Sequence, residues 1–175
     1  MASPRPLGAP LCLLAGAILV AVAALLHPHV TGDGPSQLEA IAATDAWRAV
    51  HWAFLFGFVL SVAGLAGIAA RWAGTPAAGT AWSAVVVAGF AYTAWLVIVA
   101  FMAGAGATLA QTYARADPGL TATRAVFLYD MVRPFALVAQ RVAGFALGVA
   151  TVLFGWAMLL GRAEPRWLAW SAARW

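Results

Sequence analysis

The three histidines of this chain all lie in one short stretch, residues 25–52 (LLHPHVTGDGPSQLEAIAATDAWRAVHW). His27 and His29 follow the first apolar run and His51 precedes the second, so the loop between them returns the chain to the same depth. The three imidazoles can therefore be neighbours in space. Imidazole titrates near neutral pH and is the commonest metal ligand in proteins, and Asp33 is available beside it as an acidic ligand or partner.

Four interpretations of these histidines are open, the last of them a pH-sensing role. The first is haem b, held by His51 and one of His27 or His29, with Arg133 or Arg141 pairing with the propionates. The second is a transition-metal site, for which the candidate ligands are His27, His29, His51 and Asp33. The third needs no ligand, because rings at a membrane boundary can anchor helix ends by hydrogen-bonding backbone carbonyls. His-Pro-His lacks the repeated spacing of a zinc motif, so we favour the third.

A second polar group surrounds Arg141, which opens an otherwise apolar segment. A charge at that depth normally faces the bundle interior, a cavity or an interface, and snorkelling toward headgroups is the alternative. We expect Asp45 to be its partner. The pattern predicts a polar pocket suited to a quinone head, a lipid headgroup or another small anionic ligand, and its candidate residues are Asp45, Tyr113, Tyr129, Asp130 and Arg141, with Arg133 nearby.

The composition indicates an integral membrane protein. Of its 175 residues, 64% are hydrophobic and only 9% are charged, far from the balance of a soluble domain. All ten positive residues are arginines, and a net charge of +4 spread through so apolar a chain is no signal for nucleic acid. The sequence motifs of nucleotide-binding proteins, serine hydrolases, zinc proteases and thiol oxidoreductases are absent. The sequence therefore does not predict an enzyme acting by itself.

Four apolar segments are long enough to cross a bilayer as helices, which takes about 20 residues. They lie at about 7–26, 52–70, 81–105 and 142–160. The predicted fold is an all-α membrane protein, a single domain with four transmembrane helices in an up-down bundle. Helices two to four extend into a lobe on one side, formed by about 27–51 and 106–141. The tail, 162–175, is expected to lie along the membrane interface.

Local signals place the ends of these helices. Ser36-x-x-Glu39 has the pattern of a capping box and predicts a helix from about residue 37 that runs unbroken into the second span. The Asp-Pro-Gly sequence at 117–119 predicts a turn that starts the last helix. Pro134, inside that helix, is expected to kink it.

Small residues at helical spacing predict where helices pack closely. One stripe lies on the second span and another on the fourth. Their members are Gly57, Ser61 and Gly64 on the former, and Gly144, Gly148 and Gly155 on the latter. Such a stripe can serve the bundle itself, a homodimer or a partner subunit, and the spacing does not distinguish these uses.

The charges suggest an orientation. Arginines divide equally between the two sides, so their number alone is not decisive. Most acids, however, accompany the arginines of the lobe: Asp33, Glu39, Asp45, Asp117 and Asp130. The terminal side is left strongly positive, which favours cytoplasmic termini and an external lobe.

An apolar first helix ending in His27-Pro28, an acidic loop and the sequence TDAWRAVHW before the second span resemble small uncharacterised multi-span integral membrane proteins of high-GC bacteria. The resemblance implies a multi-pass protein of the bacterial plasma membrane and no particular activity. We predict an accessory or scaffold subunit, or a ligand-binding component, of a membrane complex, in contact with lipid and with other subunits or a second copy. The alternative is a haem- or metal-binding redox protein.

Overall fold

The computed structural model describes residues 7–161, and every regular element in this range is helical. Four stretches are long and apolar enough to cross a membrane: Gly8–Leu26, Trp47–Trp72, Ala78–Arg115 and Leu120–Leu160. The predicted interfacial tail lies outside the described residues. In chain order the elements are α1 (Gly8–Leu26), α2 (Gly34–Ala42), α3 (Trp47–Ala69), the 3-10 turn η1 (Ala70–Trp72), α4 (Ala78–Phe101), the π-helical turn η2 (Met102–Gly106), α5 (Ala107–Arg115) and α6 (Leu120–Leu160).

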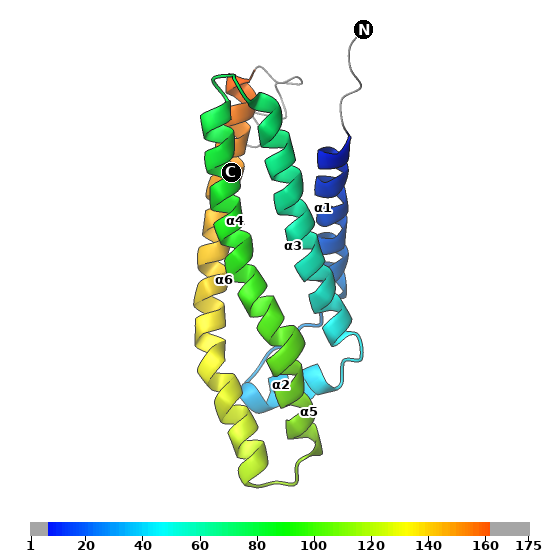
Figure 1. Ribbon diagram of the computed structural model, residues 1–175. Coiled ribbons are helices and arrows are strands. Elements are labelled where there is room, and N and C mark those ends of the chain that lie inside the picture. Colours follow the sequence, from blue (N-terminus) through cyan, green and yellow to red (C-terminus); the bar gives the residue numbers. More distant parts are fainter. Residues whose placement is uncertain (1–6, 162–175) are drawn as a thin grey trace.

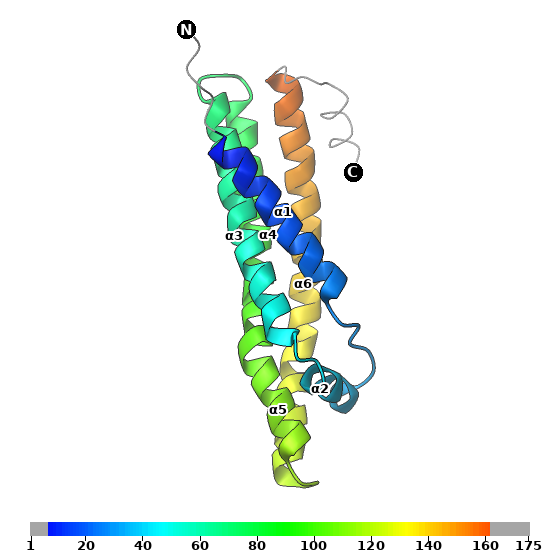
Figure 2. The ribbon, with the colours of Figure 1, turned by 90° about the vertical axis from the view of Figure 1, so that its right-hand side faces the viewer.

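The long helices pack in sequence, α1 on α3, α3 on α4 and α4 on α6, and they lie side by side in both views (Figure 1, Figure 2). Within the described chain, α1 and α6 form no comparable contact. Helices α2 and α5 lie at the end of the molecule away from the start of α1 and the end of α6 (Figure 1). We call this the α2 end.

The contact between α1 and α3 depends on glycine. A Cβ atom added to Gly64 would lie 2.5 Å from the backbone nitrogen of Leu13. One added to Gly16 would lie 2.7 Å from the carbonyl oxygen of Gly57 and 2.6 Å from Oγ of Ser61. Since lipid gives helices no hydrophobic reason to associate, this close approach of two backbones supplies the packing that holds α1 in place.

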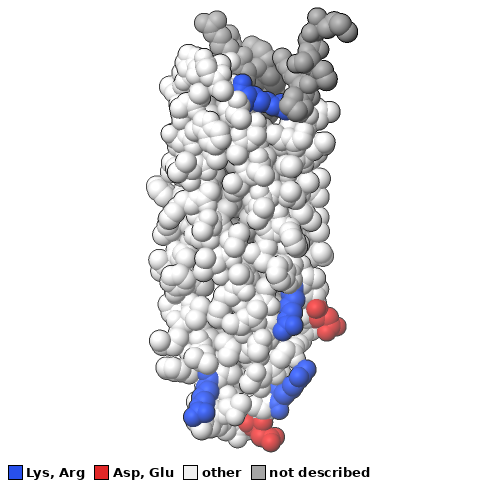
Figure 3. Space-filling model, in the orientation of Figure 1, with Lys and Arg blue, Asp and Glu red and all other residues white. Residues whose placement is uncertain are grey.

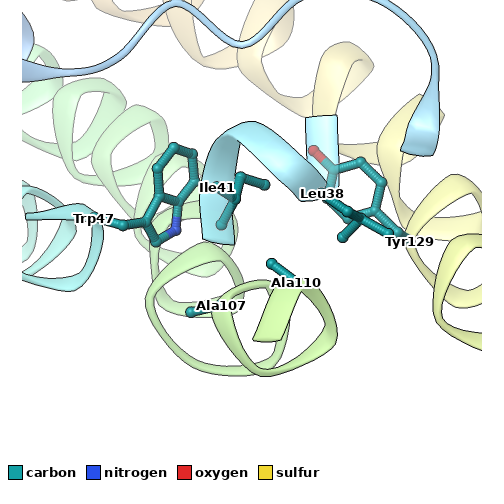
Figure 4. Close-up of a cluster of buried hydrophobic side chains, with 6 residues drawn as sticks. All are labelled: Leu38, Ile41, Trp47, Ala107, Ala110 and Tyr129. Atoms are coloured by element: carbon teal, nitrogen blue, oxygen red, sulfur yellow. The ribbon is translucent and has the colours of Figure 1, made fainter. Parts of the chain in front are cut away.

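The α2 end has its own apolar core, which fixes α2 against α5 and α6 (Figure 4). The phenol of Tyr129 donates to Oε1 of Gln37 at 2.9 Å, and the indole Nε1 of Trp47 donates to the carbonyl of Met102 at 2.9 Å. Both polar groups of these buried aromatic rings are therefore satisfied. The buried members of this core are Leu38, Ile41, Trp47, Ala107, Ala110 and Tyr129.

Two predictions about the start of α2 need correction: its continuation into the second span and the residue that caps it. The helix after the predicted capping box does not run into the second span, because α2 ends at Ala42 and α3 begins at Trp47. The break lets α2 turn across the bundle and bury its apolar side chains on α5. The N-cap is Asp33, whose carboxylate accepts a hydrogen bond from the backbone N–H of Ser36 at 3.1 Å.

The turn at 117–119 precedes α6 as predicted, and α6 continues as one helix through Pro134.

The surface supports a multi-pass membrane protein. On the face drawn in Figure 3, charged side chains gather toward the two ends and a long zone without charged side chains lies between them. Large apolar side chains of the long helices are exposed: Leu14 is 57% exposed, Phe90 59% and Phe145 77%. A soluble domain rarely exposes continuous apolar surface of this extent, whereas hydrocarbon tails accept it.

Candidate functional site

His27 and His51 meet where α1 ends and α3 begins. Their ring centroids are 5.1 Å apart, and the indole of Trp47 lies 5.3 Å from His27 and 4.4 Å from His51. Nδ1 of His27 lies 2.9 Å from the carbonyl of Pro28, and Nδ1 of His51 lies 2.7 Å from the carbonyl of Trp47. Because a carbonyl can only accept, each ring donates from Nδ1.

The pair His27–His51 does not have the spacing of two haem ligands. Imidazoles on opposite sides of one metal ion hold their ring centroids about 6.4 Å apart, given metal–nitrogen bonds of about 2.0 Å. The observed separation of 5.1 Å is too short, and Trp47 and Phe54 pack against the same rings. The rings of His27 and His51 each donate a hydrogen bond to a backbone carbonyl next to a helix end.

The predicted metal site is not assembled either. In the part of the chain that the structure describes, no three His, Cys, Asp or Glu side chains lie close enough together to hold a metal ion. His29 is exposed to solvent, and Asp33 caps α2. Hydrogen bonds from Ser36 lower the pKa of the Asp33 carboxyl. Burial lowers the pKa of His27, a hydrogen bond to Pro28 opposes that shift, and the nearby charge of His29 adds to it.

The predicted polar pocket is divided into two clefts at the α2 end. The first, which we call the acidic cleft, has a volume of about 1040 Å³ and lies between α2, α5 and α6. Two of the predicted pocket residues, Tyr113 and Asp130, line it, together with Glu39 and the apolar side chain of Phe127. Its charged lining is negative, so it does not suit the anionic ligand that the sequence predicted.

The second cleft, which we call the basic cleft, has a volume of about 560 Å³ and lies between α5 and the segment joining α2 to α3. Asp45, Arg48 and Arg115 line it, beside Trp47 and Gln111. The two arginines were missed because they lie 67 positions apart in sequence. The available signal was weak: each is an arginine in the terminal turn of a helix that borders an apolar span.

Three other predicted pocket residues lie elsewhere. Tyr129 is buried against α2 and bonded to Gln37, so it lines neither cleft. Arg133 lies 3.8 Å from Asp130 and donates to the carbonyl of Gly32 at 3.4 Å, which ties α6 to the loop before α2. Arg141 is exposed on α6 and does not pair with Asp45 in the described structure.

Two of the three glycines predicted to pack on α6 do not contact another described helix. No heavy atom of a neighbouring element lies within 4 Å of a Cβ built on Gly144 or Gly148. Arg141, Gly144 and Gly148 are spaced by three and four residues, so they share one side of the helix, which we call the open face of α6. Gly155 differs, because it is buried and lines a small cavity of about 180 Å³ beside α3 and α4.

Comparisons of this chain with known protein families, with curated proteins and with solved structures find no match. Function is therefore inferred from the two clefts and the open face of α6.

Proposed function

We propose that this protein is an accessory subunit of a bacterial plasma-membrane complex and binds a helix of another subunit on the open face of α6. The observation that carries the proposal is the free space beside Gly144 and Gly148. Glycines one turn apart on an apolar helix permit two backbones to approach closely. On α3 such residues already have α1 as a partner, whereas on α6 no other described element fills this space, and we assign the partner to another chain.

Arg141 supports this assignment by its depth. The carbonyl of its neighbour Gln140 accepts a hydrogen bond from Nε1 of Trp95 at 3.3 Å, and Trp95 lies near the middle of the apolar run 81–105. Arg141 is thus level with part of that apolar run, at the start of the fourth run, and it is exposed. An arginine that faces lipid costs up to about 2.5–3.5 kcal/mol, the value at the bilayer centre. A partner helix with an acidic or polar side chain at this level would remove that cost.

A second copy of the chain is a poorer partner. The described acids, Asp33, Glu39, Asp45, Asp117 and Asp130, all lie outside the apolar runs. In a parallel homodimer built on this face, Arg141 of each copy would oppose the same arginine of the other, and like charges repel. Charge complementarity therefore favours a different membrane subunit.

The membrane topology belongs to the same proposal. The four long helices would form an up-down bundle, with both termini in the cytoplasm and the α2 end as a lobe outside. The acids that accompany the lobe arginines support this orientation, because they leave the excess of positive charge on the side of the termini.

Photo-crosslinking in native membranes tests the docking. A photoreactive amino acid replaces Gly148, and a matched protein carries it at Gly89, a glycine of α4 that also has open space around it. We expect an adduct of one defined mass from position 148 and none from position 89, and we expect Arg141→Leu to abolish it. An adduct of twice the monomer mass would show that the partner is a second copy of this chain and not a different subunit. Absence of any adduct at position 148 would remove the proposal.

A further inference from the structure

The basic cleft combines charges of both signs within one small cavity. Arg48, from the first turn of α3, and Arg115, from the last turn of α5, line it with Asp45. In the described chain neither arginine forms an ion pair within 4.0 Å, although an acid lines the same cavity. The volume of about 560 Å³ lies within the range of about 300–1,000 Å³ that holds small ligands.

Guanidinium groups recognise phosphate oxygens through paired N–H donors. Two of them in one cleft suit a phosphate ester, and the carboxylate of Asp45 suits an ammonium group on the same molecule. We infer that the basic cleft binds a zwitterionic phosphate ester of the phosphoethanolamine class, with Arg48 and Arg115 on the phosphate and Asp45 on the ammonium.

The cleft lies at the depth of a lipid headgroup. Arg48 is four residues, or about 6 Å of helix, before Trp52, where the second apolar run begins. Thr108, also in the lining, is three residues past the end of the third run. The headgroup layer adds about 5–7 Å to each side of the hydrocarbon core. Arg115 reaches the cleft from the aqueous side, so a phospholipid headgroup and a soluble phosphate ester both have access.

The acidic cleft does not compete for this ligand. Its charged lining, Glu39 and Asp130, repels phosphate. The inference rests on the membrane placement of the chain but not on the docking of a partner helix at the open face of α6. Failure of one therefore leaves the other standing.

The test is native mass spectrometry of the full chain purified in detergent. The probes are dihexanoyl phosphatidylethanolamine, dihexanoyl phosphatidylglycerol and soluble O-phosphoethanolamine. The test variant combines Arg48→Gln with Arg115→Gln. The matched control is Arg124→Gln, an exposed arginine of α6 that lines neither cleft. Thermal unfolding of each variant establishes that it folds, since these side chains are exposed and the expected change is small.

We expect the double variant to bind phosphatidylethanolamine about tenfold more weakly, and the control to stay within about twofold of the wild type. Asp45→Asn should weaken binding of phosphatidylethanolamine and leave phosphatidylglycerol unchanged. Soluble O-phosphoethanolamine bound as tightly as the lipid would support the site and assign its ligand to the aqueous phase. Equal binding by the wild type and a folded double variant would overturn the inference. Insensitivity of phosphatidylethanolamine binding to Asp45→Asn would overturn the zwitterionic assignment.

Discussion

Helices α3 and α6 present small residues at the same spacing but to different surroundings. On α3, Gly57 and Gly64 lie so close to α1 that an added Cβ would be 2.7 Å from the side chain of Val20 or 2.5 Å from the backbone of Leu13, and Ser61, between them, faces Gly16. Gly144 and Gly148 on α6 face open space. A stripe of small residues therefore shows where a helix can approach closely, and it does not show which chain supplies that helix.

The polar side chain that accompanies the glycines also differs between α3 and α6. On α3, Ser61 donates its hydroxyl to the carbonyl of Gly57 at 2.8 Å, and this bond stays inside the helix. On α6, Arg141 carries five N–H donors and forms no ion pair with another described residue. A stripe closed within the chain satisfies its own polar groups, whereas an open one leaves a charge for another molecule to meet.

Gly64→Leu should give the largest loss of stability. The new side chain would have to fit where even a Cβ atom lies 2.5 Å from the backbone of Leu13, so α1 must move away from α3. We expect the free energy of unfolding to fall by about 3 kcal/mol, measured by unfolding in detergent. Gly79→Leu is the control, because Gly79 has open space around it. Equal stability of the two variants would show that α1 and α3 do not pack as described.

Trp47→Phe tests the α1–α3 contact where it meets the α2 end, at the site where the histidine rings contact the indole. The substitution removes the hydrogen bond from Nε1 to the carbonyl of Met102 and part of the apolar core at the α2 end. We expect a loss of about 1–2 kcal/mol in the same unfolding measurement. An unchanged stability would mean that this indole does not join α3 to the π-helical turn after α4.

The sequence predicts the helical class and the apolar spans because both follow from composition and length within single segments. It fails where the outcome depends on contacts between distant segments. The turn at Ala43–Ala46 has no glycine or proline to announce it, and α2 turns there because Leu38 and Ile41 find apolar partners on α5. The pairing of Arg48 with Arg115 in one cleft follows from that turn, so it was equally hidden. Arg141 was recognised as unusual, but its surroundings depend on the open face of α6.

Acid should weaken the α1–α3 side of the molecule and leave the open face of α6 unaffected. The pKa of His27 is lowered by burial in the fold, from an ordinary value of 6.5. Its stabilising contribution is complete above pH 6.5 and is lost as the pH falls through and below that value, because the unfolded chain takes up the proton first. His27→Phe should make unfolding in detergent less dependent on pH between about 7.5 and 5. The control His29→Gln, at an exposed position, should retain most of the pH dependence of unfolding. If it lost as much of that dependence as His27→Phe, the titration would not arise from burial of His27 against Trp47 and His51.

Gly148→Leu should have the smallest effect on the isolated protein. Nothing in the described chain lies within 4 Å of the new Cβ atom, and leucine has a higher helix propensity than glycine. In detergent we therefore expect the free energy of unfolding to change by about 0.5 kcal/mol or less, or to rise slightly. A loss as large as that of Gly64→Leu would mean that this face of α6 is closed within the monomer, and the docking surface would then be occupied by the chain itself. An unchanged monomer that no longer assembles with its partner in membranes would assign the stripe on α6 to association and the stripe on α3 to folding.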